Sequence, residues 1–340
     1  MTPLVNMRRY RVAVAGYYGF GNLGDELLAE AAIAALLRCG VDRDEIVLMS
    51  AAPEKSRQKF GLACVNRWKV FQVCRTLRQS ETLLLGGGGL FQDVSSLRSC
   101  FYYWWLVRAA RFFGTIPWAL GQSVGPLSTR IGLGLVRDAL SRCRIVQVRD
   151  KASEALCASL GLTIETGEDL ALSLGDSFTP ADDCDKPTAT LLVNLRPDRH
   201  GVAERFADTV SAYADSFDGE LVGVALSDED ERLMSKFVRE GRLTVSRIER
   251  LVSIPDAARV FRGACAAGMR LHFVILAALA RIPLVAVPYD PKVESFAVKH
   301  NIPLWRDGTL PSPRLASFPG DFSPSSFREN VDELCRKILL

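Results

Sequence analysis

The sequence predicts an α/β protein with two domains, each built on a parallel β-sheet. Short apolar runs alternate with runs of helical length and periodicity, which is typical of β-α-β units. The chain has 340 residues, more than a single hydrophobic core usually organises. One stretch, residues 176–188, interrupts the alternation with Pro, Asp and Thr and indicates a linker. Together these three observations favour two domains over one.

The predicted N-terminal domain occupies residues 1–176. Apolar runs that end in glycine or polar residues mark its strands, and a long apolar periodic run marks a helix at residues 25–40. We expect helices on both faces of the sheet, because strands joined through helices pair in parallel. The expected strands are residues 11–16, 45–51, 81–89, 116–125 and 144–150.

The remainder of the chain repeats the pattern. A linker at residues 177–188 leads to a predicted C-terminal domain at residues 189–322, and a last helix at residues 323–340 could cross back to the first domain. Because ligands bind where parallel strands end in such folds, polar residues just after a strand are the functional candidates. The expected strands of this domain are residues 189–197, 219–227, 264–270 and 282–290.

Composition excludes several classes of protein. A hydrophobic fraction of 48% with 24% charged residues describes a globular protein rather than a disordered one. The net charge of +3 offers no strong electrostatic footprint for nucleic acid, so we expect no nucleic-acid partner. The charge is uneven, since residues 1–176 hold 21 Lys and Arg against 16 Asp and Glu. That excess would suit a phosphate or an anionic surface.

Cysteine and histidine patterns indicate neither disulfides nor a metal site. The nine cysteines are odd in number and never spaced as C-x-x-C, which favours reduced thiols. No H-x-x-x-H pattern is present, so we expect no metal. The first residues lack a signal-peptide pattern, and no run reaches the ~18 apolar residues of a membrane span. We therefore expect a cytoplasmic location.

A glycine motif after the first expected strand raises the question of a dinucleotide site. Gly19-x-Gly21-x-x-Gly24 has the spacing of the dinucleotide fingerprint. In that fingerprint the first glycine directly follows the strand, and an acidic residue ends the second strand. Here the first strand ends at Gly16, and the second ends at Ser50 without an acid. The pattern therefore disfavours NAD or FAD.

Two interpretations of this loop remain open. Asn22 and Asp25 lie beside the start of the expected helix, where they could face a ligand. Alternatively, Asp25 caps the helix and the glycines only turn the chain.

Two further strand ends are rich in glycine. Of four consecutive glycines, Gly87, Gly88 and Gly89 are expected in a loop that lines the cleft. The stretch lacks the Gly-Lys-Ser/Thr of a P-loop, so ATP hydrolysis is not indicated. At the end of a later strand, in ALGQSVGP, Gln122 and Ser123 are expected as polar tips.

Basic residues follow neighbouring strands of the second domain. A short apolar strand gives way at Gly268 to Arg270 and His272, and Lys292 follows the next strand. Arg can grip a carboxylate or phosphate through two parallel hydrogen bonds, and His can shuttle protons near neutral pH. Arg149 follows a strand of the first domain in the same way. We therefore expect an anion in the cleft, held from both sides, with a proton donor beside it.

The run SCFYYWWLVRAARFFG, residues 99–114, predicts a helix whose role stays open between two alternatives. Trp and Tyr beside Arg suit a bilayer interface, which would give a peripheral membrane contact. The simpler alternative is a core or cleft-lining helix of the first domain.

In this order, the stretches GYYGFGNLGDELL, GGGGLFQD, LGQSVGP, VRDKAS, GMRLH and YDPKV resemble the polysaccharide pyruvyltransferase family, and in particular its bacterial cell-wall (CsaB) type. The resemblance implies transfer of the enolpyruvyl unit of phosphoenolpyruvate to a sugar, typically N-acetylmannosamine in a lipid-linked wall-polysaccharide precursor, which forms a cyclic pyruvate ketal. It also implies two Rossmann-like domains in a glycosyltransferase-B-like arrangement. Neither a nicotinamide cofactor nor an essential metal is implied.

The resemblance also assigns roles to individual residues. His272 matches the catalytic histidine, and Phe273 after it departs from the smaller residue that is usual there. Asn22 and Asp25 are assigned to binding of the acceptor sugar, and Gln122 is a further candidate for this contact. The phosphoenolpyruvate-binding residues implied are Arg149, Arg270 and Lys292, with Leu271 beside them.

Two other functions remain as alternatives. One is a sugar-nucleotide transferase or epimerase of the glycosyltransferase-B type, whose architecture would look alike. The other is a non-catalytic module that binds sugar phosphates. For the pyruvyltransferase, the expected location is the cytoplasm, at the inner face of the membrane if the protein contacts the bilayer.

Overall fold

The chain forms two compact units. A computed structural model describes residues 8–93, 96–178, 190–318 and 323–339. Unit 1 comprises residues 1–20, 25–173 and 326–340, and unit 2 comprises residues 21–24 and 174–325. The linker predicted at residues 177–188 lies outside the described residues from position 179 onward. The division differs from a simple cut between the predicted domains, because a short N-terminal segment groups with unit 2.

Unit 1 is built on a seven-stranded sheet in which every strand pairs in parallel, in the order β3-β2-β1-β4-β5-β6-β7. This confirms the predicted fold class. The sequence did not indicate β3 and β7, because strands of four and two residues are too short to show a periodicity. The strands are β1 (Tyr10–Ala15), β2 (Ile46–Ser50), β3 (Ala63–Asn66), β4 (Ser80–Phe91), β5 (Ile116–Val124), β6 (Val146–Val148) and β7 (Glu165–Thr166).

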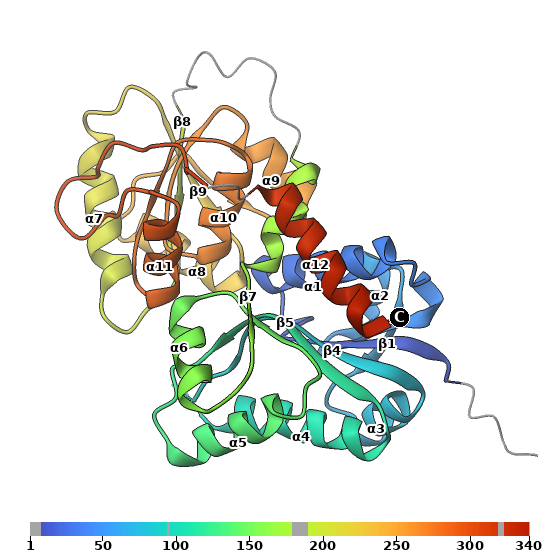
Figure 1. The fold of residues 1–340 in the computed structure, drawn as a ribbon. Helices are drawn as coiled ribbons and strands as arrows, with labels where there is room; N and C mark the ends of the chain where they lie inside the picture. The colour runs from blue at the N-terminus through green and yellow to red at the C-terminus, as the bar shows by residue number, and fades with distance from the viewer. Residues whose placement is uncertain (1–7, 94–95, 179–189, 319–322, 340) are drawn as a thin grey trace, which may run out of the picture. The chain divides into compact units, whose positions relative to one another are not determined.

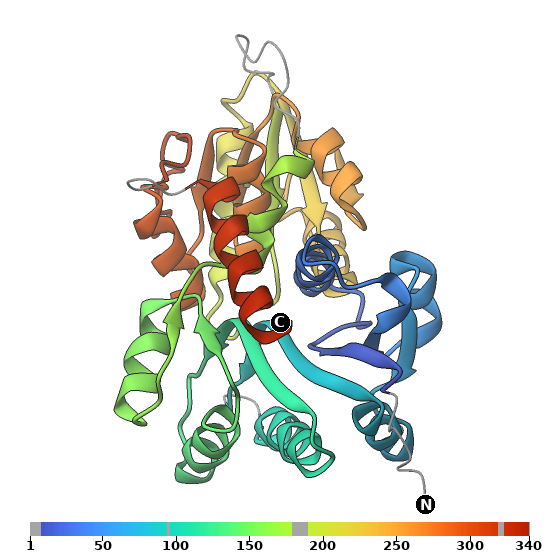
Figure 2. The ribbon, with the colours of Figure 1, turned by 45° about the vertical axis from the view of Figure 1, so that its right-hand side comes forward.

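Helices cover both faces of this sheet, and α3, α4 and α5 lie side by side on one of them (Figures 1 and 2). Short 3₁₀ turns occur at Arg43–Glu45 and Leu170–Ser177. The helices are α1 (Leu23–Arg38), α2 (Pro53–Phe60), α3 (Val70–Arg78), α4 (Arg98–Phe112), α5 (Arg130–Leu140), α6 (Lys151–Ser159) and α12 (Pro324–Leu339).

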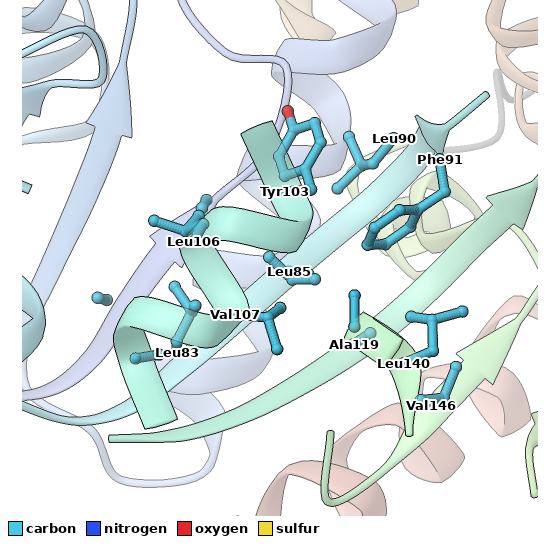
Figure 3. Packing of buried hydrophobic residues seen from close by; sticks show 14 of the residues in the cluster. Leu83, Leu85, Leu90, Phe91, Tyr103, Leu106, Val107, Ala119, Leu140 and Val146 are labelled. Atoms are coloured by element: carbon cyan, nitrogen blue, oxygen red, sulfur yellow. The ribbon is translucent and has the colours of Figure 1, made fainter. Parts of the chain in front are cut away.

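The inner side of α4 fills the core of unit 1. Tyr103, Leu106 and Val107 are buried against Leu83 and Leu85 of β4 (Figure 3). Full burial of each such apolar side chain contributes roughly 1.5–3 kcal/mol. The core alternative for residues 99–114 therefore holds for the inner side of this helix.

Unit 2 is built on a second parallel sheet, of five strands, in the order β10-β9-β8-β11-β12. Its strands are β8 (Thr190–Asn194), β9 (Glu220–Ala225), β10 (Arg247–Arg250), β11 (Cys265–Gly268) and β12 (Leu284–Ala286). Its helices are α7 (Val202–Ala214), α8 (Asp228–Arg239), α9 (Ile254–Phe261), α10 (Leu271–Leu279) and α11 (Pro291–Lys299).

Both sheets reverse their strand order at the corresponding place. The reversal lies between β1 and β4 in unit 1 and between β8 and β11 in unit 2. In open α/β sheets, ligands bind outside the carboxyl ends of the strands at such a switch point. We therefore expect a ligand-binding site at the carboxyl ends of the strands at these two switch points.

The last helix, α12, belongs by its contacts to unit 1. Arg38 at the end of α1 makes a two-pronged ion pair with Asp332, with a shortest N–O distance of 2.8 Å. Arg11 of β1 donates to the carbonyl of Leu339 at 3.1 Å. These contacts tie the end of the chain to its first strand and first helix.

The glycines expected at the end of a strand and in a loop after it lie inside the strand, so the predicted loop was wrong. Gly87, Gly88 and Gly89 are part of β4, and the first two are buried and have positive φ angles. A Cβ at Gly87 would lie 2.9 Å from Leu28 of α1. Gly87 and Gly88 therefore allow a helix of the same unit to approach the strand closely.

His300 is a buried residue of unit 2, although it stands in the polar stretch VKHN. It follows α11, is 0% exposed, and its ring lies 4.3 Å from that of Phe296 and 5.0 Å from that of Phe318. Burial lowers the pKa of this imidazole from 6.5 to about 4. The folded protein therefore holds His300 neutral at pH values where an exposed histidine takes up a proton.

We expect His300 to make the protein less stable in mild acid. Between pH ~6.5 and ~4 the unfolded chain binds a proton at this position that the folded chain does not, so the free energy of unfolding falls as the pH falls through this window. The contribution is at most about 3.5 kcal/mol, since the pKa differs by about 2.5 units and one pKa unit corresponds to about 1.4 kcal/mol. Urea unfolding of the wild type and of His300→Phe at both ends of the window measures it. An identical loss in both proteins would show that His300 does not titrate in this way.

Candidate functional site

Asn194 organises the carboxyl edge of the sheet in unit 2. It ends β8 at the switch point and is 0% exposed. Its amide nitrogen donates to the carbonyl of Val224 in β9 at 2.8 Å, and its amide oxygen accepts from the backbone N–H of Arg270, which follows β11, at 2.9 Å. One side chain thus holds three neighbouring strand ends in register.

Arg270 is clamped at this edge by a buried carboxylate. Its Nε and Nη2 donate to the two oxygens of Asp230 at 2.5 and 2.6 Å, and Nη2 also donates to Ser227 at 2.6 Å. The Arg270 side chain is 11% exposed and that of Asp230 is 0% exposed. Asp230 also accepts from the backbone N–H of Leu226 at 3.1 Å. The guanidinium predicted to bind an anion is therefore fixed in orientation and paired with one negative charge.

A second cation, which sequence analysis did not identify, lies at the same edge of the sheet. Arg196 follows β8, and its Nη1 donates to the hydroxyl of Tyr289 at 2.5 Å, with the guanidinium 4.5 Å from the ring centroid. Burial raises the pKa of the Tyr289 hydroxyl, while the nearby charges of Arg196 and Arg270 act to lower it. The strand ends of β8 and β11 thus carry cations that act on one phenol, Tyr289, which follows β12.

His272 lies in the first turn of α10, directly after Arg270 and Leu271, and is partly exposed. Gly24 packs on its imidazole, since a Cβ there would lie within 2.7 Å of the His272 Cγ. The segment that contains Gly24 is attached to unit 2 by the Leu23 N–H, which donates to Leu226 at 2.9 Å. The guanidinium of Arg250 also donates a hydrogen bond to the carbonyl of Gly21 at 2.8 Å. The last glycine of the G-x-G-x-x-G motif thus makes room for a histidine.

Lys292 follows β12 and lies in the first turn of α11, so it shares the edge with Arg270 and His272 as predicted from the strand ends. Its backbone N–H donates to the capping side chain of Asp290 at 2.9 Å. The Lys292 side chain is partly buried.

Asn22 and Asp25 flank the start of α1. The amide oxygen of Asn22 accepts from the backbone N–H of Gly24 at 3.3 Å, which is the geometry of a cap. Asp25 lies in the first turn, where a negative charge is favourable at a helix N-terminus. Both side chains are partly exposed. The capping role considered for Asp25 is thus performed by Asn22, and their role toward a sugar stays a prediction.

In unit 1, Arg149 follows β6 and is almost fully buried. Its Nη1 pairs with Asp169, and its Nε donates to Ser123 at 2.7 Å. The side chains of Arg149 and Asp169 are 6% and 3% exposed. Ser123 in turn donates to Asp150, the N-cap of α6, at 2.6 Å. This ion pair lies two strands away from the switch point between β1 and β4.

Gln122 and Ser123 lie close to the end of β5, but they are buried and do not form an exposed polar tip. Both lie within β5 and are 0% exposed. Gln122 donates to the carbonyls of Leu85 and Leu120 at 3.0 and 3.1 Å. Its burial between strands disfavours the predicted contact with an acceptor sugar.

Tyr18 occupies the switch point of unit 1. Its hydroxyl donates to the carbonyl of Gly86 at 2.9 Å, and the side chain is 0% exposed. A Cβ at Gly16 or at Gly86 would collide with its ring or hydroxyl. The place where a dinucleotide would lie in this fold is therefore filled by the protein's own side chain.

Among the described residues, no group of three or more His, Cys, Asp and Glu side chains could hold a metal ion. No described helix is both long and apolar enough to cross a bilayer.

Sequence analysis did not identify three residues of these sites: two carboxylates that pair with the predicted arginines, and one further arginine. Asp230 stands in the acidic run SDEDE and looks like any solvated helix start, although it alone of the four acids there is buried. Asp169 lies in a stretch without periodicity. Arg196, in NLRP directly after a strand, had the same sequence signal as Arg149 and could have been found by it.

Comparison with known families favours one of the functions considered for this chain. Residues 22–291 match the family described as polysaccharide pyruvyl transferase. The chain belongs to the polysaccharide pyruvyl transferase family. The matched range contains Arg149, Arg270 and His272 and ends one residue before Lys292. No curated protein matches the sequence of this pyruvyl transferase family member.

Solved structures of other proteins share the fold of this pyruvyl transferase family member at low identity. The UDP-GlcNAc 2-epimerase of Methanocaldococcus jannaschii matches with a TM-score of 0.62 and 10% identity over 95% of this chain and 99% of that one. Anabaena HepE, in complex with UDP and glucose, matches with a TM-score of 0.57 and 11% identity over 96% and 90%. These neighbours confirm a glycosyltransferase-B-like fold of two parallel-sheet α/β domains.

We expect the buried pair in unit 1 to be a determinant of stability. Arg149→Ala removes the cation beside the buried carboxylate of Asp169 and should lower the free energy of unfolding by about 3–5 kcal/mol. Arg149→Met combined with Asp169→Leu should recover most of this loss, because neither charge then remains in the interior. Urea unfolding measures all three proteins.

Arg205→Ala is the matched control, because its ion pair with Asp307 is 50% and 60% exposed. Its loss should stay below about 1 kcal/mol. Equal stability of Arg149→Ala and the wild type would rule out the structural role of Arg149.

Proposed function

We propose that the protein transfers the enolpyruvyl unit of phosphoenolpyruvate to two hydroxyls of a sugar and releases phosphate, leaving a cyclic pyruvate ketal. The observation that carries this proposal is His272 in the turn after Arg270, at the switch point of unit 2, in a chain of the polysaccharide pyruvyl transferase family. A proton donor beside an oriented guanidinium suits a donor substrate that is both anionic and activated by protonation.

Phosphoenolpyruvate carries a carboxylate and a phosphate, so the binding edge must supply fixed cations. Arg270 is oriented by Asp230, and Arg196 and Lys292 follow the strands on either side of β11. Arg270, Leu271 and Lys292 form the proposed donor site of unit 2, and Arg149 is the proposed contribution of unit 1. Preorganised donors of this kind stabilise charge without reorganising during the reaction.

The reaction balances with His272 as the group that protonates carbon. His272 donates a proton to the methylene carbon, which becomes a methyl group and leaves oxocarbenium character at C2. One sugar hydroxyl adds to C2, the C2–O bond to phosphate breaks, and the second hydroxyl closes the ketal ring. Of the two protons that the hydroxyls release, one restores His272 and the other leaves with phosphate. Asp25 is the candidate base for the hydroxyls.

The acceptor that we propose is N-acetylmannosamine within a lipid-linked precursor of a bacterial cell-wall polysaccharide. The support is the sequence resemblance to the cell-wall branch of the family. Asn22 and Asp25, at the start of α1 and next to Gly24, are the proposed acceptor contacts. The reaction as written needs neither a metal nor a redox cofactor, and it suits a protein that works in the cytoplasm, where phosphoenolpyruvate is available.

The test is an assay with phosphoenolpyruvate and a panel of N-acetylhexosaminides, in which phosphate release and the mass of the sugar product are measured. We expect both signals together, and in D₂O we expect deuterium in the new methyl group. His272→Ala should lower kcat by roughly 10²-fold or more, the range for loss of a proton-transfer group. His200→Ala, at an exposed position, is the control and should leave kcat unchanged.

Three outcomes would contradict the proposal. Wild-type turnover by His272→Ala would remove this residue from the mechanism. Binding of UDP-N-acetylglucosamine in place of phosphoenolpyruvate would favour a sugar-nucleotide enzyme. Saturable phosphoenolpyruvate binding without phosphate release for any acceptor would favour a binding module.

A second prediction concerns the glycine beside the imidazole. Gly24→Ala places a methyl group where His272 lies, and the ring can turn away because it is the end of a side chain. We therefore expect folding to persist, and kcat to fall on the order of 10²-fold, as for a misplaced catalytic group.

Gly134→Ala is the matched control for this substitution. It lies in α5 with nothing within 4 Å of its added Cβ, so it should not affect turnover. Normal kcat in Gly24→Ala would show that the position of His272 does not depend on the missing Cβ.

A further inference from the structure

The outer sides of α3, α4 and α5 have an unusual composition. In these three helices, all of whose residues are described, 14 residues are exposed, and twelve of them are either arginine or large and apolar. Seven are arginines, five are large apolar residues, and the other two are Gln72 and Gly134. The arginines are Arg75, Arg78, Arg98, Arg108, Arg111, Arg130 and Arg137, and the apolar residues are Val70, Phe71, Phe101, Phe112 and Ile131. These twelve residues are called the α3–α5 face below.

Acidic residues are almost absent from these helices. Asp138 is their single carboxylate, and it is occupied by Arg142 at 2.7 Å and Arg108 at 3.7 Å. A solvated helix normally mixes charges of both signs on its outer side. The exposed residues of α8 in unit 2 do so, with three acids, three bases and one valine. The α3–α5 face is therefore not an ordinary solvated surface.

Several apolar side chains of the α3–α5 face are largely exposed to water, which is energetically unfavourable. Phe71 is 92% exposed, Phe112 83% and Ile131 65%. Phe71, Phe101 and Ile131 come from the first turns of the three helices, which lie side by side on one face of the sheet (Figure 2). Exposed apolar groups that gather on one side of a molecule mark an interaction surface.

We propose that the α3–α5 face docks on the surface of an anionic lipid bilayer. Arginines on the same surface as phenylalanine and isoleucine are the composition of helices that lie in a membrane interface, where the cations meet anionic headgroups and the apolar tips enter the acyl boundary. The contact is peripheral, consistent with the lack of a spanning helix among the described residues.

Other occupants fit the composition less well. A symmetric dimer through this face would bring two sets of arginines together, and like charges opposed across an interface are unfavourable. A nucleic acid would contact the arginines, but its affinity depends on phosphate contacts and gains little from the aliphatic Val70 and Ile131.

The inference goes beyond the proposed reaction and can be tested without donor or acceptor. The purified full chain is mixed with vesicles of phosphatidylcholine alone, or of phosphatidylcholine with phosphatidylglycerol, and sedimented at low and at high salt. We expect sedimentation only with the anionic vesicles, and weaker binding at high salt because the headgroup attraction is screened.

Two variants separate the charge from the apolar contribution. Arg75→Gln with Arg78→Gln and Arg111→Gln should lower the partition coefficient by roughly 100-fold, at about 1 kcal/mol for each arginine near the surface. Phe71→Ser with Phe112→Ser should also weaken binding, and the weakening should persist at high salt. The matched control replaces three exposed arginines of unit 2, in Arg232→Gln with Arg239→Gln and Arg262→Gln, and should bind as the wild type does.

Any of three results overturns the proposal. The first is no binding of the wild type to anionic vesicles at low salt. The second is equal loss in the control, which would show attraction by net charge alone. The third is a dimer of the wild type that the α3–α5 variants convert to a monomer, which would assign this face to a second copy of the chain.

Discussion

The ion pair between Arg270 and Asp230 is the interaction on which the candidate site depends. It joins the turn after β11 to the start of α8, and Asn194 ties the turn after β11 and strand β9 to the end of β8. Burying two charges costs more than their attraction returns unless the remaining hydrogen bonds are satisfied, and a buried pair is weak evidence for stability. We therefore interpret the pair as a means of holding one guanidinium in a fixed direction at the switch point.

The same logic applies to Arg149 and Asp169 in unit 1, and it changes how an anion would be recognised. Because each predicted arginine is already paired with a carboxylate, neither adds a full net positive charge to its surroundings. Recognition would then depend on oriented N–H donors and on cations that have no carboxylate partner among the described residues, such as Arg196, rather than on bulk positive potential. This agrees with a chain whose net charge is only +3.

Most strands of both sheets could be predicted from the sequence, but the contacts at the carboxyl ends of the strands could not. Parallel strands buried on both faces read as apolar runs, so β1, β2, β8 and β9 are visible in the sequence. The glycines of β4 led to a wrong prediction of a loop. They make room for the side chains of Tyr18 and Leu28, which are distant in sequence. Asp230 was hidden for the same reason, since only the fold shows which acid of its run is buried.

The G-x-G-x-x-G motif shows why spacing alone does not assign a ligand. In a dinucleotide site the third glycine lets a helix pack closely on a strand. Here Gly24 is also in the first turn of a helix, but the group that needs the missing Cβ is the imidazole of His272. Both arrangements require a residue without a side chain at the same helical position, so they produce the same sequence pattern. What separates them is the neighbouring strand ends, since Ser50 ends β2 where a ribose-binding acid would be needed, and Tyr18 fills the switch point.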